Sequence, residues 1–410
     1  MPVTLQFGQY GNQLAPSFLQ HILQYSQAPP ASDLTAYFRF QESVRKLIPR
    51  SVLIDMEPKV IEKCLVSKKL NYQHSQAIWR QSGAGNNWAH GYKNFGQSAG
   101  SDILDTIRKE SEHVDRNLEY LTFSSLAGGT GSGLSSYVIQ ELDEQKMKIT
   151  SQCILPFMQG EINVQCYNSI LSFAKMLEHS SQIIPLANDD ARIIYMKSNP
   201  TQSKTPNFEQ MNSVIGHNLA LNMFSQELDF NCNLFKIWNC RATPSVSKTE
   251  SRKLFGIVNT VKQLLLTGSI VDSQMDYQIS LKNTTQKYCT GQIQLFGSLI
   301  QNPKDIHGSE LQKLQQELKD LKTVTVQPQL FKMQSCTIKQ MKQQPLENCS
   351  SIALNGMLLK KEFETLKNDL VQKLARRQFL HFYEDRGVER DEIVDAIVVV
   401  EQMIKNYDEI

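Results

Sequence analysis

The 410-residue chain lacks the long hydrophobic runs, the charge excess and the secretory features that would assign it to several common classes of protein. Its longest apolar run, Ala396–Val400, is far shorter than the roughly 18–20 residues of a membrane span. Lys and Arg together number 43 and Asp and Glu 41, so the net charge of +2 gives no indication of a nucleic acid or an anionic membrane as partner. The N-terminal residues do not combine a charged segment with an apolar one, so we expect no secretory signal.

Cysteine pairs are also lacking, because none of the eight cysteines forms a C-x-x-C motif or shares zinc-ligand spacing with a histidine. We therefore expect reduced thiols, an intracellular location and no zinc site. The eight histidines show no catalytic-triad pattern, so we expect structural or surface histidines. The chain is 40% hydrophobic, which is an ordinary globular composition, and at roughly 100–200 residues per domain its length allows two to four domains.

Short apolar strands alternate with helical stretches through the first half of the chain. The expected strands are Val3–Phe7, Ser51–Asp55, Tyr120–Leu126 and Cys153–Phe157. The expected helices follow Gly11 and cover Ile103–Val114 and Leu134–Gln145. This alternation predicts an α/β fold with a doubly wound parallel sheet.

The second half of the chain is mixed and then helical. A polar connection with two prolines, Ser198–Asn207, leads into an expected helix over Phe208–Phe224. Near the end, two stretches that begin at Leu359 and Ile393 repeat apolar residues at helical spacing. Between these helical parts, the sequence predicts helices over Leu254–Leu266 and Ser309–Leu321 and strands over Gly291–Leu299, Phe331–Ile338 and Ser350–Leu354.

The strongest local motif is the glycine loop AGGTGSG at Ala127–Gly133, between a strand and a helix. Its backbone N–H groups, the helix N-terminus and the hydroxyls of Thr130 and Ser132 suit a phosphate group. The alternative is a tight turn in which glycines take positive φ, so that a side chain at Gly129 or Gly131 would be strained. Leu134 stands where a dinucleotide fingerprint needs glycine, and no lysine follows as in a Walker A loop.

Three other segments carry weaker signals. Gly8–Gln13 forms a second loop between a strand and a helix, so it predicts either a second wall of a phosphate pocket or an ordinary turn. Asp55 and Glu57 follow a strand and suit Mg²⁺, or else they belong to the solvated start of a helix at Pro58. The loop Gly83–Gly91 offers amide groups to a phosphate or a partner, although by itself it is only a loop.

Taken in this order, the motifs resemble those of the tubulin family. GQYGNQ at Gly8–Gln13 is similar to the family's GQCGNQ, AGGTGSG to its GGGTGSG, and GAGNNWAHGY at Gly83–Tyr92 to its GAGNNWAxGH/Y. Ala127, together with the segments Asp55–Ile61 and Glu161–Leu171, resembles the delta class of this family more narrowly.

The resemblance implies a nucleotide-binding domain over residues 1–197, a central helix with an intermediate domain over 198–355, and a C-terminal helical region over 356–410. It also implies GTP or GDP and Mg²⁺ as cofactors. Asp55 and Glu57 would lie by the Mg²⁺, Phe208 would stack on guanine, and Asn212 and Asp189 would read the base. The residues expected around the phosphates are Gly8, Gln9, Tyr10, Asn86, Ala127, Gly128, Gly129, Thr130, Gly131 and Ser132.

Two departures from the family pattern bear on activity. Tyr10 replaces the family's cysteine, so a bulky ring must fit beside ribose or phosphate. In the family an acid after the central helix acts on the neighbouring subunit's nucleotide, and Glu227 is the closest match here, while its companion acid aligns with Phe224. A surface glutamate on a helix is an equal alternative for Glu227. We therefore expect at most a slow GTPase that a partner subunit completes.

The resemblance implies a GTP-binding structural or assembly subunit in the cytoplasm and cytoskeleton, acting in the triplet microtubules of centrioles or basal bodies. Its partners would be other tubulins and microtubule or centriolar proteins, with no nucleic acid and no membrane. The alternative is a soluble nucleotide-dependent regulator of tubulin that does not enter a lattice. A dinucleotide-dependent oxidoreductase is disfavoured because the dinucleotide fingerprint fails and no catalytic acid–base pair is evident.

Overall fold

The computed structural model divides the chain into two compact units. The first comprises Met1–Leu23, Pro30–Asp189 and Leu359–Ile404, and the second comprises Gln24–Pro29, Asp190–Leu358 and Lys405–Ile410. The structure describes residues 1–25, 34–43, 45–67, 69–114, 118–158, 162–198, 205–225, 236–242, 290–296 and 349–409. The C-terminal helices thus belong to the same unit as the N-terminal half of the chain.

A six-stranded parallel sheet forms the centre of the first unit, in the order β5-β4-β1-β6-β7-β8. Apolar residues line both of its faces, as expected for strands that helices cover on both sides. The strands are β1 (Pro2–Phe7), β4 (Ser51–Ile54), β5 (Ala77–Ile78), β6 (Glu119–Ser125), β7 (Lys148–Leu155) and β8 (Gln182–Ala187). The predicted doubly wound α/β fold is confirmed.

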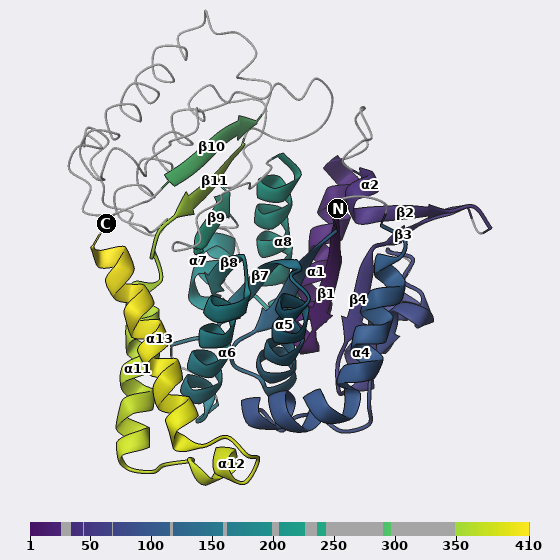
Figure 1. Ribbon diagram of the computed structural model, residues 1–410. Coiled ribbons are helices and arrows are strands. Elements are labelled where there is room, and N and C mark those ends of the chain that lie inside the picture. Colours follow the sequence, from purple (N-terminus) through teal and green to yellow (C-terminus); the bar gives the residue numbers. More distant parts are fainter. Residues whose placement is uncertain are drawn as a thin grey trace, which may run out of the picture. The chain divides into compact units, whose positions relative to one another are not determined.

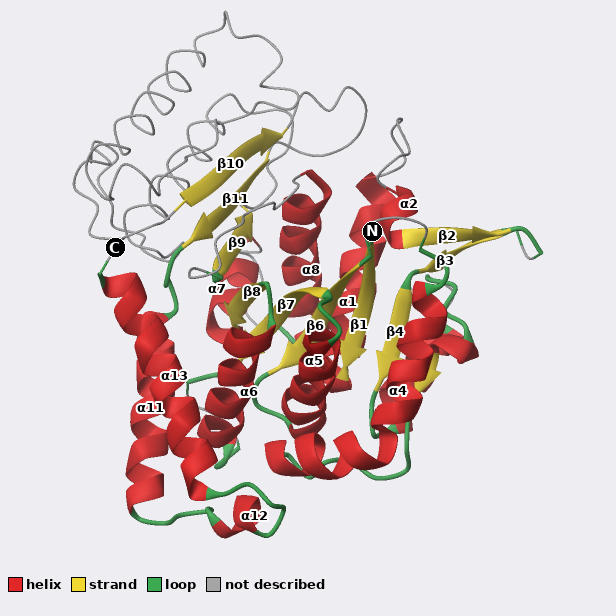
Figure 2. Ribbon diagram, in the orientation of Figure 1, coloured by secondary structure: helices red, strands yellow, loops and turns green. Residues whose placement is uncertain are grey.

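Helices cover both faces of this sheet. Figure 2 shows α4 (Gly96–Ser111), α5 (Ser135–Glu144) and α6 (Gln165–His179) side by side on one face. On the other side, α1 (Gly8–Tyr25) contacts α3 (Pro58–Val66), where the Cys64 thiol donates to the Asn12 carbonyl at 3.1 Å. The smaller elements of this unit are α2 (Leu34–Tyr37), β2 (Phe38–Gln41), β3 (Lys46–Pro49) and the 3₁₀ turn η2 (His74–Gln76).

The C-terminal part forms a helical hairpin. Helix α11 (Lys360–Ala375) runs beside α13 (Arg390–Asp408), with the short α12 (His381–Glu384) between them (Figure 1). The Phe363 ring of α11 stacks on Phe173 of α6 at a centroid distance of 4.0 Å. The apolar residues that predicted these two helices are buried: Leu359, Phe363, Leu366, Leu370, Leu374, Ile393, Ile397, Val400, Ile404 and Tyr407.

The described part of the second unit contains two helices and an antiparallel sheet in the order β10-β11-β9. Its elements are α7 (Asn188–Ser198), α8 (Phe208–Ser225), β9 (Trp238–Ala242), β10 (Thr290–Phe296) and β11 (Cys349–Asn355). The predicted helices over Leu254–Leu266 and Ser309–Leu321 and the predicted strand over Phe331–Ile338 lie outside the described residues.

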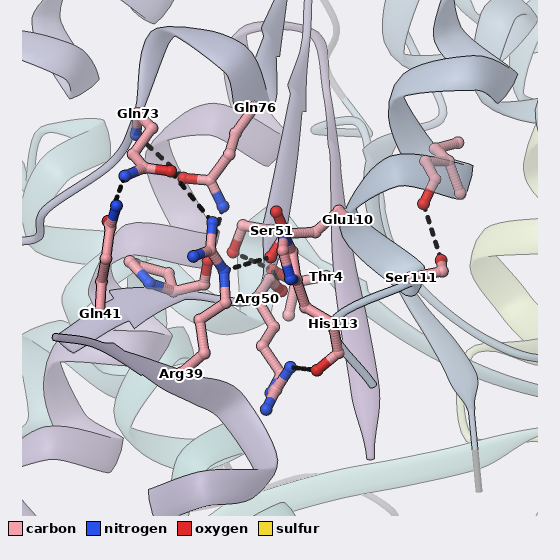
Figure 3. Close-up of polar contacts among 12 residues, drawn as sticks. Thr4, Arg39, Gln41, Arg50, Ser51, Gln73, Gln76, Glu110, Ser111 and His113 are labelled. Carbon is pink, nitrogen blue, oxygen red and sulfur yellow. Dashed lines mark hydrogen bonds and ion pairs between the residues drawn. The ribbon is translucent and has the colours of Figure 1, made fainter. Parts of the chain in front are cut away.

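A charged cluster ties the β2–β3 ribbon to the end of α4, near the amino ends of β4 and β6 (Figure 3). Arg39 donates from Nε to a Glu110 carboxylate oxygen at 3.3 Å and from Nη2 to the Gln73 side chain at 3.0 Å. Arg50 donates to the carbonyl groups of Thr35 and His113. Burial raises the pKa of Glu110, although Arg39 opposes the shift. This network fixes the end of the sheet opposite to the glycine loops.

Candidate functional site

The two segments predicted as phosphate loops meet at the carboxyl edge of the sheet, although Gly8–Gln13 is not a loop and forms the first turns of α1. Strands β1 and β6 are parallel neighbours, so the segments that follow them leave the sheet at the same edge. Gly8 has φ +64, and a Cβ built on it would lie 3.0 Å from the backbone nitrogen of Gly131. Gln9 is exposed beside this contact, whereas Tyr10 is half-buried. The Tyr10 hydroxyl lies 3.1 Å from the Nε2 donor of Gln152 on β7, so its ring points toward the sheet.

The glycine loop differs from the expected turn. Gly129 has φ −78, and positive φ among the described glycines occurs at Gly8, Gly85 and Gly387. The expected positive φ at Gly129 and Gly131 was therefore wrong. Close approach by neighbouring backbone requires glycine instead, because a Cβ on Gly129 would lie 2.7 Å from the Asn87 nitrogen.

The helix after the glycine loop also begins earlier than predicted. Residues Thr130–Leu134 already form a π-helical turn, η4, which continues into α5. Thr130 and Ser132 are buried, and the Ser132 hydroxyl donates to the carbonyl of Gly128. Irregular helical turns of this kind occur often at functional sites.

A second π-helical turn, η3 (His90–Phe95), packs directly on η4. A Cβ on Gly91 would lie 2.3 Å from the Gly129 carbonyl oxygen, and one on Gly133 would lie 2.2 Å from the Trp88 carbonyl oxygen. The predicted loop Gly83–Gly91 is thus in backbone contact with the glycine loop. Asn86, in the same loop, has φ 52 and its side chain is exposed.

Asp55 and Glu57 lie at the end of β4. The Oδ1 atom of Asp55 accepts the N–H groups of Met56 at 2.8 Å and Glu57 at 3.4 Å. Burial raises the pKa of Asp55 to about 6. Glu57 precedes Pro58 at the start of α3, and its carboxylate lies against Gly83, where a Cβ would come within 2.2 Å of Oε1. The acidic pair therefore adjoins the loop that packs on the glycine loop.

These two carboxylates can serve as partial ligands of a cation. Within the part of the chain that the structure describes, no group of three or more His, Cys, Asp or Glu side chains could hold a metal ion. Mg²⁺ commonly takes only one or two protein carboxylates and completes its shell with phosphate oxygens and water. Asp55 and Glu57 fit that kind of site.

Asn168 on α6 is a site residue that the motif analysis did not single out. Its side chain is fully buried and all four hydrogen-bonding positions of its amide are occupied. Nδ2 donates to the carbonyls of Asn86 at 2.8 Å and Ala127 at 2.6 Å. Oδ1 accepts the Trp88 N–H at 2.9 Å and the Tyr383 hydroxyl at 2.7 Å. The signal available in the sequence was an asparagine among apolar residues, since Tyr167, Ile170 and Leu171 stand close to it.

The predicted base-reading residues are divided between the two units. In the first unit, the Asp189 carboxylate accepts the backbone N–H of Met158 at 3.1 Å. In the second unit, Phe208 and Asn212 lie one turn apart on α8, with Phe208 56% exposed and Asn212 buried. The predicted acid Glu227 lies outside the described residues.

Two other expectations concern the chain as a whole. Cys64, Cys153 and Cys166 carry free thiols and are buried, and Cys240 is also buried. None of the described helices combines the length and the apolar character needed to cross a membrane.

Comparisons with known proteins agree with the motifs. The model of the Tubulin/FtsZ family, GTPase domain, matches residues 2–195. Over 99% of its length the chain is 26% identical to the tubulin delta chain of Canis lupus familiaris, of which 99% is covered. It is 27% identical, at the same coverage of both chains, to the tubulin delta chains of Macaca fascicularis and Homo sapiens.

Proposed function

We propose that this chain, which belongs to the tubulin family, binds GTP and GDP at the carboxyl edge of its parallel sheet and acts as a structural or assembly subunit of microtubule-based structures. The observation that carries the proposal is the convergence of three glycine-containing segments there. Gly8 approaches Gly131, and Gly129 approaches the segment at Ala84–Asn87. Only backbone without side chains permits these approaches, and such backbone presents its N–H groups to a phosphate.

Mg²⁺ bound by Asp55 and Glu57 would complete the phosphate site. The raised pKa of Asp55 supports this role, because a buried carboxylate gains most when a cation neutralises its charge. The exposed Asn86 and Gln9 would contact the phosphates from the two neighbouring loops. The bound cation would supply charge neutralisation between the carboxylates and the phosphates.

Guanine recognition is proposed for Asp189, Phe208 and Asn212. A carboxylate can accept from both N1–H and the N2 amino group of guanine, which adenine does not offer, and an exposed aromatic ring can stack on the base. Hydrogen bonds of this kind discriminate strongly because the wrong base leaves buried polar groups unpaired. GTP should therefore outcompete ATP.

Hydrolysis, if a lattice contact completes the site, would use Glu227 in trans. The broken acidic pair at Phe224 and Glu227 supports slow turnover by the isolated chain, because phosphoryl transfer depends on precise positioning of the attacking water. Rapid hydrolysis by the monomer that Glu227→Ala leaves unchanged would contradict this part of the proposal.

The similarity to tubulin delta chains supports a place in the triplet microtubules of centrioles or basal bodies. Co-sedimentation with microtubules, combined with localisation to basal bodies, tests that place directly. Binding to free tubulin without co-sedimentation would instead indicate a soluble regulator.

Nucleotide extraction from the purified chain, followed by chromatography, is the decisive first experiment. We expect GTP or GDP at about one molecule per chain, and competition assays should give a marked preference for GTP over ATP. Absence of bound nucleotide together with no measurable GTP binding would refute the proposed function.

A further inference from the structure

We propose that Asn168 is a positioning residue that holds the Gly83–Gly91 loop and the glycine loop Ala127–Gly133 in one arrangement. It also links them to the C-terminal segment at residues 381–386, which includes α12. This inference rests on the proposed nucleotide site. It adds a residue that positions the loops without contacting the nucleotide itself. Asn168 comes from α6, which provides none of the predicted phosphate contacts. Its amide joins the Asn86 and Ala127 carbonyls, which belong to different loops.

The chemistry of the contact requires an amide. The Asn86 and Ala127 carbonyls both need donors, whereas the Trp88 N–H and the Tyr383 hydroxyl both need an acceptor. A neutral amide offers two donor hydrogens and an acceptor oxygen, while a carboxylate offers acceptors alone. Because the side chain is fully buried, water cannot replace a contact that is lost. The Asn168 side chain therefore fixes the position of one loop relative to the other.

The C-terminal segment reaches the same loops through three contacts. The Tyr383 hydroxyl donates to Asn168, the Asn87 side chain donates to the Phe382 carbonyl at 3.0 Å, and Arg386 approaches the His90 ring nitrogen at 3.4 Å. Asn87 also accepts the His90 N–H at 2.9 Å. The segment thus lies against the residues that connect Asn86 to η3.

Nucleotide binding and docking of this segment should consequently depend on each other. A phosphate bound to the loops favours the arrangement that Asn168 holds, and a docked Tyr383 favours the same arrangement. Linkage requires the effect to be reciprocal, so GTP should protect the α12 amides from hydrogen exchange. Loss of the Tyr383 contact should reduce the fraction of free protein whose loops are ready to bind.

A pair of stacked tyrosines offers a matched test. The Tyr383 and Tyr167 rings stack at a centroid distance of 4.7 Å, and each carries a hydroxyl that makes a hydrogen bond of its own. The Tyr383 hydroxyl reaches Asn168, whereas the Tyr167 hydroxyl donates to the Gln378 carbonyl at 2.7 Å. Tyr383→Phe and Tyr167→Phe each remove one hydroxyl and preserve the stacked rings, so both variants should fold.

We expect Tyr383→Phe to weaken GTP binding about three- to tenfold, as the loss of one hydrogen bond predicts. Tyr167→Phe should stay within about twofold of the wild type. GTP titrations should be combined with hydrogen exchange of the α12 amides with and without GTP. In the wild type and in Tyr167→Phe, GTP should slow exchange at Tyr383 and Glu384, and in Tyr383→Phe this effect should be lost.

The outcomes separate this inference from the proposed function. A wild type that binds no guanine nucleotide would refute the proposed function and this inference with it. A wild type that binds GTP while the two variants show equal affinity would overturn the inference alone. GTP-dependent protection that persists in Tyr383→Phe would also overturn it, since the link through Asn168 would then be unnecessary.

Discussion

A methyl group added at Gly133 tests whether the two π-helical turns are held together by backbone contact. The new Cβ would lie 2.2 Å from the Trp88 carbonyl oxygen, 2.8 Å from the Tyr92 nitrogen and 3.0 Å from the Gly91 Cα. Ordinary van der Waals contact begins at about 3.4 Å. All three neighbours are backbone atoms, so rotation of a side chain cannot relieve the overlap. The two turns must move apart by about 1 Å.

Two opposing effects set the size of the change in stability. Replacing glycine by alanine in a helix favours folding by about 1 kcal/mol. Overpacking costs about 1–3 kcal/mol, and the upper end applies here because the neighbours are backbone atoms. We therefore expect Gly133→Ala to lower the free energy of unfolding by about 2 kcal/mol.

Urea unfolding of Gly133→Ala and Gly128→Ala provides the measurement and its control. Gly128 lies in the same loop, but the nearest atom to its added Cβ would be Asn86 Oδ1 at 3.9 Å. Gly128→Ala should therefore stay within about 0.5 kcal/mol of the wild type. If Gly133→Ala were as stable as the wild type or more so, helix propensity would outweigh the contact, and the argument from backbone approach would fail.

Three further predictions concern the site and the opposite end of the sheet. Gly131→Val should lose its nucleotide, since even a Cβ lies 3.2 Å from the Ser125 nitrogen and oxygen; stoichiometric nucleotide in the folded variant would refute this. With nucleotide and metal removed, ionising Asp55 costs about 3 kcal/mol above pH 7, because burial raises its pKa to about 6. Asp55→Asn should then exceed the wild type in stability at pH 7.5, with the gain disappearing by about pH 4; a gain independent of pH would count against this explanation. Arg39→Met should lose about 3 kcal/mol at pH 7.5 in urea unfolding, because Glu110 stays buried without its cation. Since burial already raises the pKa of Glu110, the loss should shrink as the pH falls and the carboxyl takes up a proton, and a loss that does not change with pH would contradict this cause.

Local patterns were sufficient to predict most of the first unit. At β1 and again at β6, a strand, a glycine-containing segment and the start of a helix follow one another, so the order of the sequence predicts the carboxyl edge where both glycine-containing segments lie. Strand β8 was missed although all six of its residues are buried. Pro185 interrupts its apolar run, and proline is normally a signal against a strand. The structure resolves the conflict, because β8 is an edge strand of the sheet.

The details of the site could not be predicted in the same way. Glycine permits positive φ and also close backbone approach, and the sequence does not distinguish these two reasons. At Gly129 the second applies, and it depends on a loop more than 40 residues away in the sequence. Asn168 depends on partners still further apart, since Tyr383 lies 215 residues along the chain. Contacts of this kind follow from tertiary packing and leave no local period or motif.

The two ends of the sheet use different polar chemistry, and the difference fits the proposed site. At the amino end, the half-buried Arg39 forms an ion pair with the buried carboxylate of Glu110. At the carboxyl edge, neutral amides connect the backbone: Asn168 joins two loops, and Asn12 donates to the carbonyls of Gln6, Gly8 and Ile54. Neutral amides hold these segments in place without a negative charge that would repel a bound anion. Asp55 is a buried carboxylate beside this edge, and the proposed divalent cation would offset its repulsion of a phosphate.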